Sequence, residues 1–225
     1  PTFRHEAFEQ YKAQREETPE VIRLSVPIIK DIIRAYRIPI LEVQGYEADD
    51  VIGTLATEAG KQGITTYMMT PDKDYGQLVS ENVFMYRPKY GDKEFEVMGV
   101  EEVKAKFNIE SPLQVIDMLG LMGDSSDNIP GCPGVGEKTA QKLIAQFGSI
   151  ENLLSHSNEL KGALKTKVET NQEMILFSKF LATIKTDVPI ELNLEELKRE
   201  TPDEDALRKI FEEMEFRTLI ERVLG

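Results

Sequence analysis

The sequence predicts an α/β protein in which a mainly parallel sheet with flanking helices is followed by an all-α module. Up to about residue 100, short apolar runs typical of strands alternate with segments of helical periodicity, and this order is typical of a parallel sheet. From Val100 onward the apolar residues recur at helical spacing throughout. With 225 residues, 40% of them hydrophobic, the chain is long enough for one large domain or two small ones.

Two helices are expected at the N-terminal end. Residues 3–17 have the composition of a polar helix, and Thr18-Pro19 supplies an N-cap and a first-turn proline for a second helix that runs to about Tyr36. Pro27 lies inside this second helix and predicts a kink. One row of its residues has helical spacing and is expected to face a core: Ile22, Val26, Ile29 and Ile33.

Strands and helices then alternate along the chain. Strands are predicted at 38–43, 65–70 and 83–86, with helices at 47–59 and 75–80 between them. Because the carboxyl ends of parallel strands meet at one edge of a sheet, polar clusters that follow the strands are expected to gather there. The apolar spacing predicts the remaining helices at 101–107, 112–122, 137–147, 149–155, 161–183 and 204–215.

Composition and charge exclude several classes of protein. No apolar run approaches the roughly 18 residues that a membrane span needs, so we expect no membrane association. One cysteine, Cys132, and two histidines cannot form an intramolecular disulfide or complete a zinc site, which fits a reducing cytosol. The net charge of -13 is unevenly spread, because residues 41–60 contain no lysine or arginine whereas residues 130–186 are mildly basic. This segregation suits a protein that concentrates cations in one place and phosphates in another.

Three acidic clusters are the strongest chemical signal. Within each cluster the carboxylates are two or three residues apart, which brings them to one side of a helix or of an extended segment. Gathered together they would repel one another unless a cation lay between them, and oxygen-only ligands favour Mg²⁺ or Mn²⁺. A pair of such ions can support in-line hydrolysis of a phosphodiester. The clusters contain seven acids: Glu47, Asp49 and Asp50, Asp72 and Asp74, and Asp124 and Asp127.

A plainer interpretation is that these acids complement helix dipoles and remain in water. Apolar residues adjoin the first and third clusters, however, and solvated faces rarely lie at such junctions. The segments that begin at Asp72 and Asp124 do not continue with the glycine and glutamate of an EF-hand. A metal-dependent phosphatase of small substrates is a further alternative, which the mildly basic stretch of residues 130–186 disfavours.

A glycine-rich segment, residues 128–140, precedes a predicted helix. Glycines allow close backbone approach, and free amides at a helix start favour a phosphate there. The spacing differs from that of a P-loop, which disfavours a nucleoside triphosphate. A tight turn between packed helices is the alternative, although nearby lysines favour a backbone phosphate. The candidate residues are Gly131, Gly134, Gly136, Lys138, Thr139 and Lys142.

Three basic residues lie in the predicted N-terminal helix. Arg4, Lys12 and Arg15 are spaced to lie along one side of that helix. They form either a solvated face or a second phosphate contact.

Four segments follow one another in an order that identifies a family: PTFRHEAFEQYKAQR (1–15), GYEADDVIGTLA (45–56), TPDKDYGQL (70–78) and GLMGDSSDNIPGCPGVGEKTAQKLIAQFGS (120–149). Together they resemble the 5′-nuclease domain of bacterial DNA polymerases I, which belongs to the flap-endonuclease superfamily. The resemblance implies 5′-3′ exonuclease and flap-endonuclease activity in primer removal and DNA repair. Its substrate would be branched or nicked duplex DNA with a 5′ flap or an RNA primer.

The resemblance also implies an organisation for the whole chain. A PIN-like nuclease core would span residues 1–100 and a helix-three-turn-helix DNA-binding module residues 101–186. A helical segment, residues 187–225, would lead toward the polymerase domains of the same parent chain. The protein would act as a monomer in the bacterial cytoplasm, associated with the nucleoid.

Functional residues follow from the same resemblance. The seven acids match the family's ligands for two Mg²⁺ or Mn²⁺ ions, and residues 129–139 match the hairpin that grips duplex phosphates with a K⁺ ion on backbone carbonyls. Lys12 and Arg15 match basic positions of the helical arch through which the single strand passes, where the lysine helps to place the scissile phosphate.

The chain departs from the family pattern at its start. Family members begin with two strands that each contribute an aspartate, and both are absent before Pro1. We therefore expect a sheet that lacks two strands and a weaker metal position beside Glu47 and Asp49. The alternative to a nuclease is a catalytically incomplete fragment that binds duplex DNA.

Overall fold

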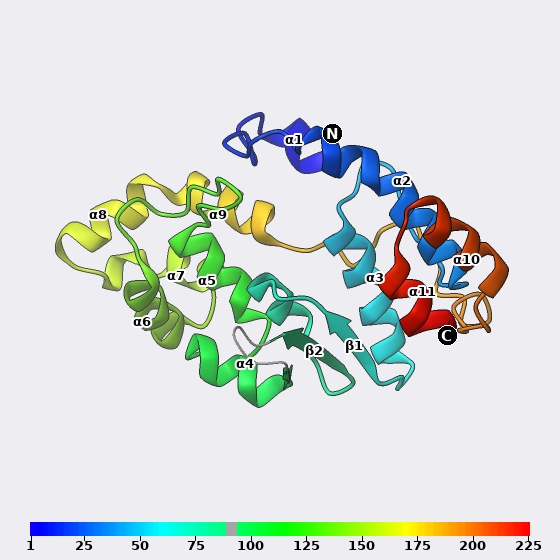
Figure 1. Ribbon diagram of the computed structural model, residues 1–225. Coiled ribbons are helices and arrows are strands. Elements are labelled where there is room, and N and C mark those ends of the chain that lie inside the picture. Colours follow the sequence, from blue (N-terminus) through cyan, green and yellow to red (C-terminus); the bar gives the residue numbers. More distant parts are fainter. Residues whose placement is uncertain (89–93) are drawn as a thin grey trace. The chain divides into compact units, whose positions relative to one another are not determined.

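The computed structural model describes residues 1–88 and 94–225, which form two compact units (Figure 1). Unit 1 comprises residues 1–14 and 43–190, and unit 2 comprises residues 15–42 and 191–225. The boundaries near residues 100 and 186 that the sequence suggests stay predictions. Among the described helices, none is long and apolar enough to cross a membrane.

Unit 1 contains a three-stranded sheet in the order β1-β2-β3. Strand β1 (Thr66–Met69) pairs in parallel with β2 (Val83–Pro88), as predicted, and β2 pairs antiparallel with β3 (Phe95–Met98). Strand β3 was not predicted from the sequence. The expected parallel arrangement is therefore found in the β1–β2 pairing and not in the β2–β3 pairing. One face of the sheet is buried in the core through Met68, Val83, Met85 and Met98.

Apart from the N-terminal helix, which is shorter than predicted, the predicted helices of unit 1 are present, and one of them is divided. The predicted helix at 161–183 is two helices, which meet at Asn171. The elements are α1 (Phe3–Ala7), α3 (Ala48–Lys61), the 3-10 helix η1 (Lys73–Leu78), α4 (Val100–Phe107), α5 (Gln114–Met122), α6 (Glu137–Phe147), α7 (Ile150–Ser155), the 3-10 helix η2 (Ser157–Glu159), α8 (Gly162–Thr170) and α9 (Gln172–Ala182).

Two sequence-based elements are wrong. The strand expected at 38–43 is irregular, because Pro39 has no N–H to donate to a sheet. The helix expected at 3–17 ends at Ala7, since the following segment binds the loop after α5 instead. The backbone N–H of Lys12 donates to the carbonyl of Asp127 at 3.0 Å, and Lys12 has a φ of 56°. Long-range contacts therefore replace helical hydrogen bonds here.

Helix α5 anchors the core of unit 1. Val115, Met118, Leu119 and Leu121 have no exposed area. A Cβ atom at Gly120 would lie 3.0 Å from the Cβ of Lys179, so this glycine permits close packing of α5 against α9. The result is a rigid base for the loop that follows α5.

The loop between α5 and α6 is tightly closed on itself. Asp124 and Ile129 exchange two backbone hydrogen bonds of 2.8 and 3.0 Å. Gly123 and Gly131 have positive φ values, and a Cβ atom at Gly131 would lie 2.3 Å from the amide nitrogen of Gly123. Only glycine fits this close approach, which fixes Asp124 and Asp127 on one short turn.

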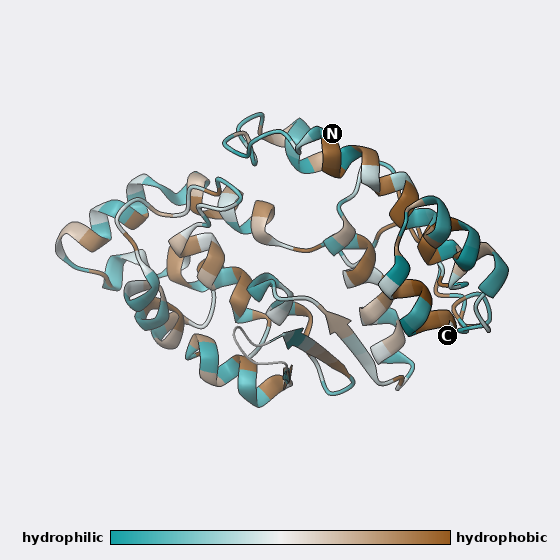
Figure 2. Ribbon diagram, viewed as in Figure 1, coloured by the Kyte–Doolittle hydropathy of each residue, from teal (hydrophilic) through white to brown (hydrophobic). Residues whose placement is uncertain are grey.

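Unit 2 is a helical cluster. Helix α2 (Glu20–Ala35), at its C-terminal end, packs against α10 (Glu204–Glu213), which is followed by α11 (Arg217–Leu224), a helix that the sequence reading missed. Leu207 and Phe211 are buried there among apolar residues of α2 and α11. Figure 2 shows apolar residues along α2, and several of them are exposed: Val21, Ile22, Leu24, Val26 and Ile29.

Candidate functional site

Arg4 and Asp50 form a buried ion pair at the start of α3. Arg4 donates two hydrogen bonds of 2.8 Å to the carboxylate oxygens of Asp50 and one of 2.7 Å to Glu47. Its remaining donors reach the carbonyls of Leu181 and Thr183 at 2.9 and 2.7 Å. Arg4 is 2% exposed and Asp50 is fully buried. All donor groups of the guanidinium are thus directed into the protein.

This arrangement corrects two expectations. Arg4 was expected to contact DNA, but a buried and fully hydrogen-bonded guanidinium cannot reach an external phosphate. Asp50 was expected to bind a metal ion, but its oxygens accept hydrogen bonds from Arg4 and from the amides of Glu47 and Lys185. Burial alone would raise the pKa of Asp50, yet these hydrogen bonds hold it below its ordinary value.

Glu47 and Asp127 lie side by side around Tyr11 and Lys12. The hydroxyl of Tyr11 is 3.1 Å from Glu47 and 3.3 Å from Asp127. The ammonium of Lys12 forms ion pairs with the same two carboxylates, and its Nζ is 3.5 Å from Oδ2 of Asp127. Burial and the two carboxylates raise the pKa of Tyr11, so its hydroxyl remains a proton donor. The structure therefore joins the first acidic cluster to the third.

A second group joins Asp124 to the acids of η1. The ammonium of Lys73 is 3.1 Å from one oxygen of Asp124, and the other oxygen accepts hydrogen bonds from the amide and hydroxyl of Ser126. Burial opposes ionisation of Asp124, but these hydrogen bonds lower its pKa below the ordinary value. Asp72 caps η1 by accepting a hydrogen bond of 3.0 Å from the amide of Asp74.

Asp74 is the member of this group whose ionised form is disfavoured. Burial, followed by the charges of Asp72 and Asp124, raises its pKa from 3.8 to about 7. In the part of the chain that the structure describes, its Oδ1 is the buried side-chain oxygen that lacks a hydrogen-bond partner. A carboxylate oxygen in this position lacks the partner that its ionised form requires.

Asp49 links the two groups electrostatically. Its carboxylate accepts a hydrogen bond of 3.0 Å from the hydroxyl of Tyr75. Burial raises the pKa of Asp49, and the charges of Glu47 and Asp72 add to the shift. Six of the seven predicted acids therefore belong to one electrostatically coupled set, and Asp50 is directed away from it toward Arg4.

The coupled acids do not form a ready metal site. Within residues 1–88 and 94–225, no three Asp, Glu, His or Cys side chains are arranged to hold a metal ion. Lys12 and Lys73 instead balance carboxylates that a metal ion would otherwise bind. The donor set nevertheless fits Mg²⁺ or Mn²⁺, because it consists of carboxylate oxygens and includes the unpartnered oxygen of Asp74.

The predicted hairpin residues differ in exposure. Gly134, Gly136, Lys138 and Lys142 are exposed, and Thr139 is half-buried. Gly131 is buried, and its amide donates to the hydroxyl of Ser178 at 2.9 Å. The amide of Gly131 therefore already has a partner inside the protein, and a contact of Gly131 with DNA stays a prediction for its carbonyl.

Two residues of the site were missed by sequence reasoning. Tyr11 meets acids that are 36 and 116 residues away in sequence, so no local pattern marks it. Lys73 stands between two predicted ligands, and its sequence position gave no reason to expect a pair with Asp124. Arg15, predicted to contact the scissile strand, is exposed.

Arg4→Met is expected to lower the free energy of unfolding of unit 1 by about 3–5 kcal/mol, because it leaves Asp50 buried and unpaired. Lys104→Met is the matched control, since Lys104 pairs with Glu101 on the surface of the same unit, and its cost should be below about 1 kcal/mol. Urea unfolding measures both values. Equal losses in the two variants would show that the Arg4 pair does not stabilise the fold.

Asp74→Asn is expected to stabilise the protein in a pH-dependent way. The pKa of Asp74 rises from 3.8 to about 7 on folding, so its ionisation destabilises the fold increasingly as pH rises through this range. The Tm gain of Asp74→Asn should be greatest above pH 7 and vanish near about pH 4. Mn²⁺ should raise the Tm of the unaltered protein more than that of the variant. A gain that is the same at all pH values would contradict this explanation.

Comparisons with known proteins agree with this architecture. A family model described as "5'-3' exonuclease, N-terminal resolvase-like domain" matches residues 1–108, and one described as "5'-3' exonuclease, C-terminal SAM fold" matches residues 110–205. DNA polymerase I of Bacillus caldotenax is 43% identical over 223 residues, which are 99% of this chain and 25% of that protein. The chain thus spans about a quarter of the length of the curated relatives it matches.

Two solved structures share the fold. The T5 D15 protein co-crystallized with metal ions has a TM-score of 0.68 at 19% identity, covering 95% of this chain and 79% of that one. The catalytic core of Rad2 in complex with DNA substrate has a TM-score of 0.64 at 17% identity, covering 98% of this chain and 76% of that one. These likenesses confirm the predicted α/β core and helical module. Because the two family models account for nearly all of its length, this chain belongs to the family of 5′-3′ exonucleases.

Proposed function

We propose that this chain is the 5′-3′ exonuclease part of a bacterial DNA polymerase I and that it hydrolyses phosphodiester bonds in branched or nicked DNA. Its substrates are duplexes with a 5′ flap or an RNA primer, and it acts in primer removal and repair in the bacterial cytoplasm, at the nucleoid, as a monomer beside polymerase domains of the same chain. The observation that carries the proposal is the coupled set of six carboxylates from the start of α3, from η1 with its N-cap, and from the loop after α5.

Divalent cations complete the proposed site. Two Mg²⁺ or Mn²⁺ ions are assigned to Glu47, Asp49, Asp72, Asp74, Asp124 and Asp127. Such ions supply an activated water and stabilise the leaving oxygen in phosphodiester hydrolysis. Co-crystallization of the T5 D15 protein with metal ions supports a metal requirement in this fold.

Lys12 and Arg15 have the proposed task of holding the scissile phosphate. Lys12 is half-buried and contacts Glu47 and Asp127, so its ammonium lies at the border of the acidic set. With metal ions on those acids, the ammonium would be free to pair with a phosphate. In the hydrolysis the oxygen of water bonds to phosphorus and the water gives up a proton, while the bond to the leaving oxygen breaks and that oxygen takes up a proton.

The hairpin between α5 and α6 is proposed to grip the duplex. The exposed residues Gly134, Gly136, Lys138 and Lys142, with Thr139, offer amides and charges to backbone phosphates, and a K⁺ ion on the carbonyls of residues 129–139 is part of the same proposal. The complex of Rad2 with DNA substrate supports DNA as the ligand of this fold.

A second candidate function is duplex-DNA binding without cleavage. The ion pairs of Lys12 and Lys73 with the predicted ligands favour it, because they balance the acids in the absence of metal. The two candidates differ in a single measurable property, which is turnover of a 5′-flap substrate.

The cleavage assay incubates the chain with a labelled 5′-flap duplex and Mg²⁺ or Mn²⁺. Asp124→Asn should reduce turnover at least about 100-fold, because it removes a ligand from the metal set, while duplex affinity stays equal or improves as a negative charge is lost. The control is Asp187→Asn, whose side chain is 79% exposed and lies outside the set, and which should cleave normally. Binding without cleavage by the unaltered chain would favour the second candidate, and undiminished turnover in Asp124→Asn would remove that acid from the site.

A further inference from the structure

A cavity of about 550 Å³ opens in unit 1 beside the acidic set. Three carboxylates line it: Glu137 at the start of α6, and Asp72 and Asp124, two of the proposed metal ligands, so the cavity adjoins the site. Three cationic side chains from three different elements also line it: Lys73 of η1, Arg87 of β2 and Lys106 of α4. Convergence of separate elements on one cavity places these cations close together.

The guanidinium of Arg87 is weakly engaged by the protein. Its Nε is 3.9 Å from a carboxylate oxygen of Glu96, near the limit for an ion pair. Its Nη1 donates to the sulfur of Met98 at 3.7 Å, and a thioether is a weak acceptor. Arg87 therefore keeps donors that a stronger acceptor could use.

Lys106 stands among like charges. Among the described residues, no carboxylate lies within 4.0 Å of its ammonium. Other cations that line this cavity or the cavity of unit 2 do have such a partner: Lys73, Arg87, Arg37 and Lys198. Burial, followed by the charge of Arg87, lowers the pKa of Lys106; the charge of Glu96 opposes this shift and that of Lys73 adds to it. An anion in the cavity would relieve this repulsion.

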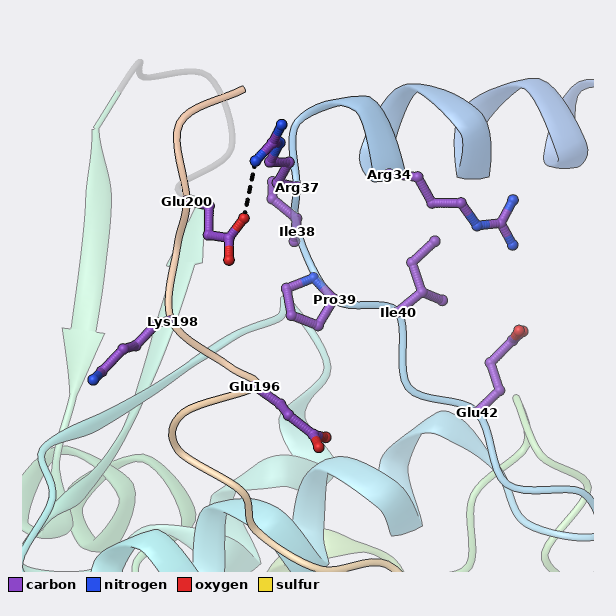
Figure 3. Close-up of a pocket in the computed structure, with 9 residues that line it drawn as sticks. All are labelled: Arg34, Arg37, Ile38, Pro39, Ile40, Glu42, Glu196, Lys198 and Glu200. Atoms are coloured by element: carbon purple, nitrogen blue, oxygen red, sulfur yellow. Dashed lines mark hydrogen bonds and ion pairs between the residues drawn. The ribbon is translucent and has the colours of Figure 1, made fainter. Parts of the chain in front are cut away.

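A cavity of about 360 Å³ in unit 2 provides the contrast (Figure 3). Like the first cavity, it is lined by charges of both signs, but two of its cations are engaged by acids at short distances. Arg37 pairs with Glu200 at 3.1 Å, as the dashed line in Figure 3 marks, and Lys198 pairs with Glu195 at 2.6 Å. Charges that already neutralise one another do not select an anion.

We propose that Arg87 and Lys106, assisted by Lys73, form a subsite that binds a backbone phosphate of the substrate strand next to the one that is cleaved. The proposal rests on the nuclease function proposed above, because a strand whose scissile phosphate lies at the acidic set has its neighbouring phosphates beside this cavity. The negative charges of Asp72 and Asp124 oppose phosphate binding only until divalent cations balance them. Arginine is suited to the task, since its planar guanidinium can donate two hydrogen bonds to one phosphate.

Lys106→Ala and Arg87→Ala/Lys106→Ala test the subsite in the full chain. Binding of a 5′-flap duplex is followed by fluorescence anisotropy over a series of KCl concentrations, with Ca²⁺ present so that a divalent cation balances Asp72 and Asp124. Lys106→Ala should weaken binding by about three- to tenfold and reduce the slope of log K against log[salt] by about 0.9, the value for one lost phosphate contact. With Mn²⁺, its KM should rise while kcat stays nearly unchanged.

Matched variants separate charge from general structure. Lys106→Arg should restore the affinity and the slope, because it retains the positive charge. Lys104→Ala removes a lysine from the same helix, one that is paired with Glu101 and lies outside the cavity, and it should behave as the unaltered chain does.

The outcomes distinguish this proposal from the function on which it rests. If the unaltered chain cleaves the flap, and Lys106→Ala has the same KM and the same slope of log K against log[salt], the subsite proposal is overturned and the proposed nuclease function is retained. If the unaltered chain neither binds nor cleaves the flap, both proposals fall. A third arm adds inorganic phosphate and follows the NMR signals of the Lys106 side chain. A saturable response there, without any effect of Lys106→Ala on DNA, would assign the cavity to free phosphate and overturn the strand assignment.

Discussion

Mutual repulsion among carboxylates is the constraint on which the rest of unit 1 depends. Six acids from the start of α3, from η1 with its N-cap, and from the loop after α5 influence one another's protonation, and such a set needs positive charge close by. The protein supplies this charge through Lys12 and Lys73, which bridge the acids. Burial, followed by the charges of Asp72 and Asp124, raises the pKa of Asp74, and the charge of Lys73 offsets this only in part.

Two kinds of cation thus surround the acids. Arg4 is buried, and its five hydrogen bonds tie α1, the start of α3 and the end of α9 together, which makes it part of the fold. Lys12 and Lys73 reach the acids from more exposed positions, and in the proposed function they would leave the carboxylates to metal ions and pair with phosphate. The same reasoning extends to the neighbouring cavity, where Arg87 and Lys106 carry positive charge that the protein itself balances poorly.

Local patterns predicted most of the helices, strands β1 and β2, and the acidic clusters, because periodicity and the spacing of carboxylates are properties of short segments. The same patterns gave wrong predictions where contacts between residues distant in sequence determine the local conformation or the partner of a side chain. The segment after Ala7 binds the Asp127 loop rather than continuing a helix, and Arg4 pairs with an acid 46 residues away. No strand forms at 38–43, although the apolar composition of this segment predicts one, because Pro39 has no N–H to donate to a sheet. The exposed glycines and lysines of the hairpin were recognisable, but the bond of Gly131 to Ser178 was not.

In the proposed function divalent ions replace lysine charge within the acidic set, and paramagnetic broadening by Mn²⁺ tests this most directly. Side-chain carboxyl signals are recorded by NMR as Mn²⁺ is added to the unaltered chain. The signals of Asp49, Asp74 and Asp124 should broaden early, the ammonium signals of Lys12 and Lys73 should change, and acids remote from the set should be affected least. Broadening centred on acids outside the set, or lysine signals that do not change, would contradict it.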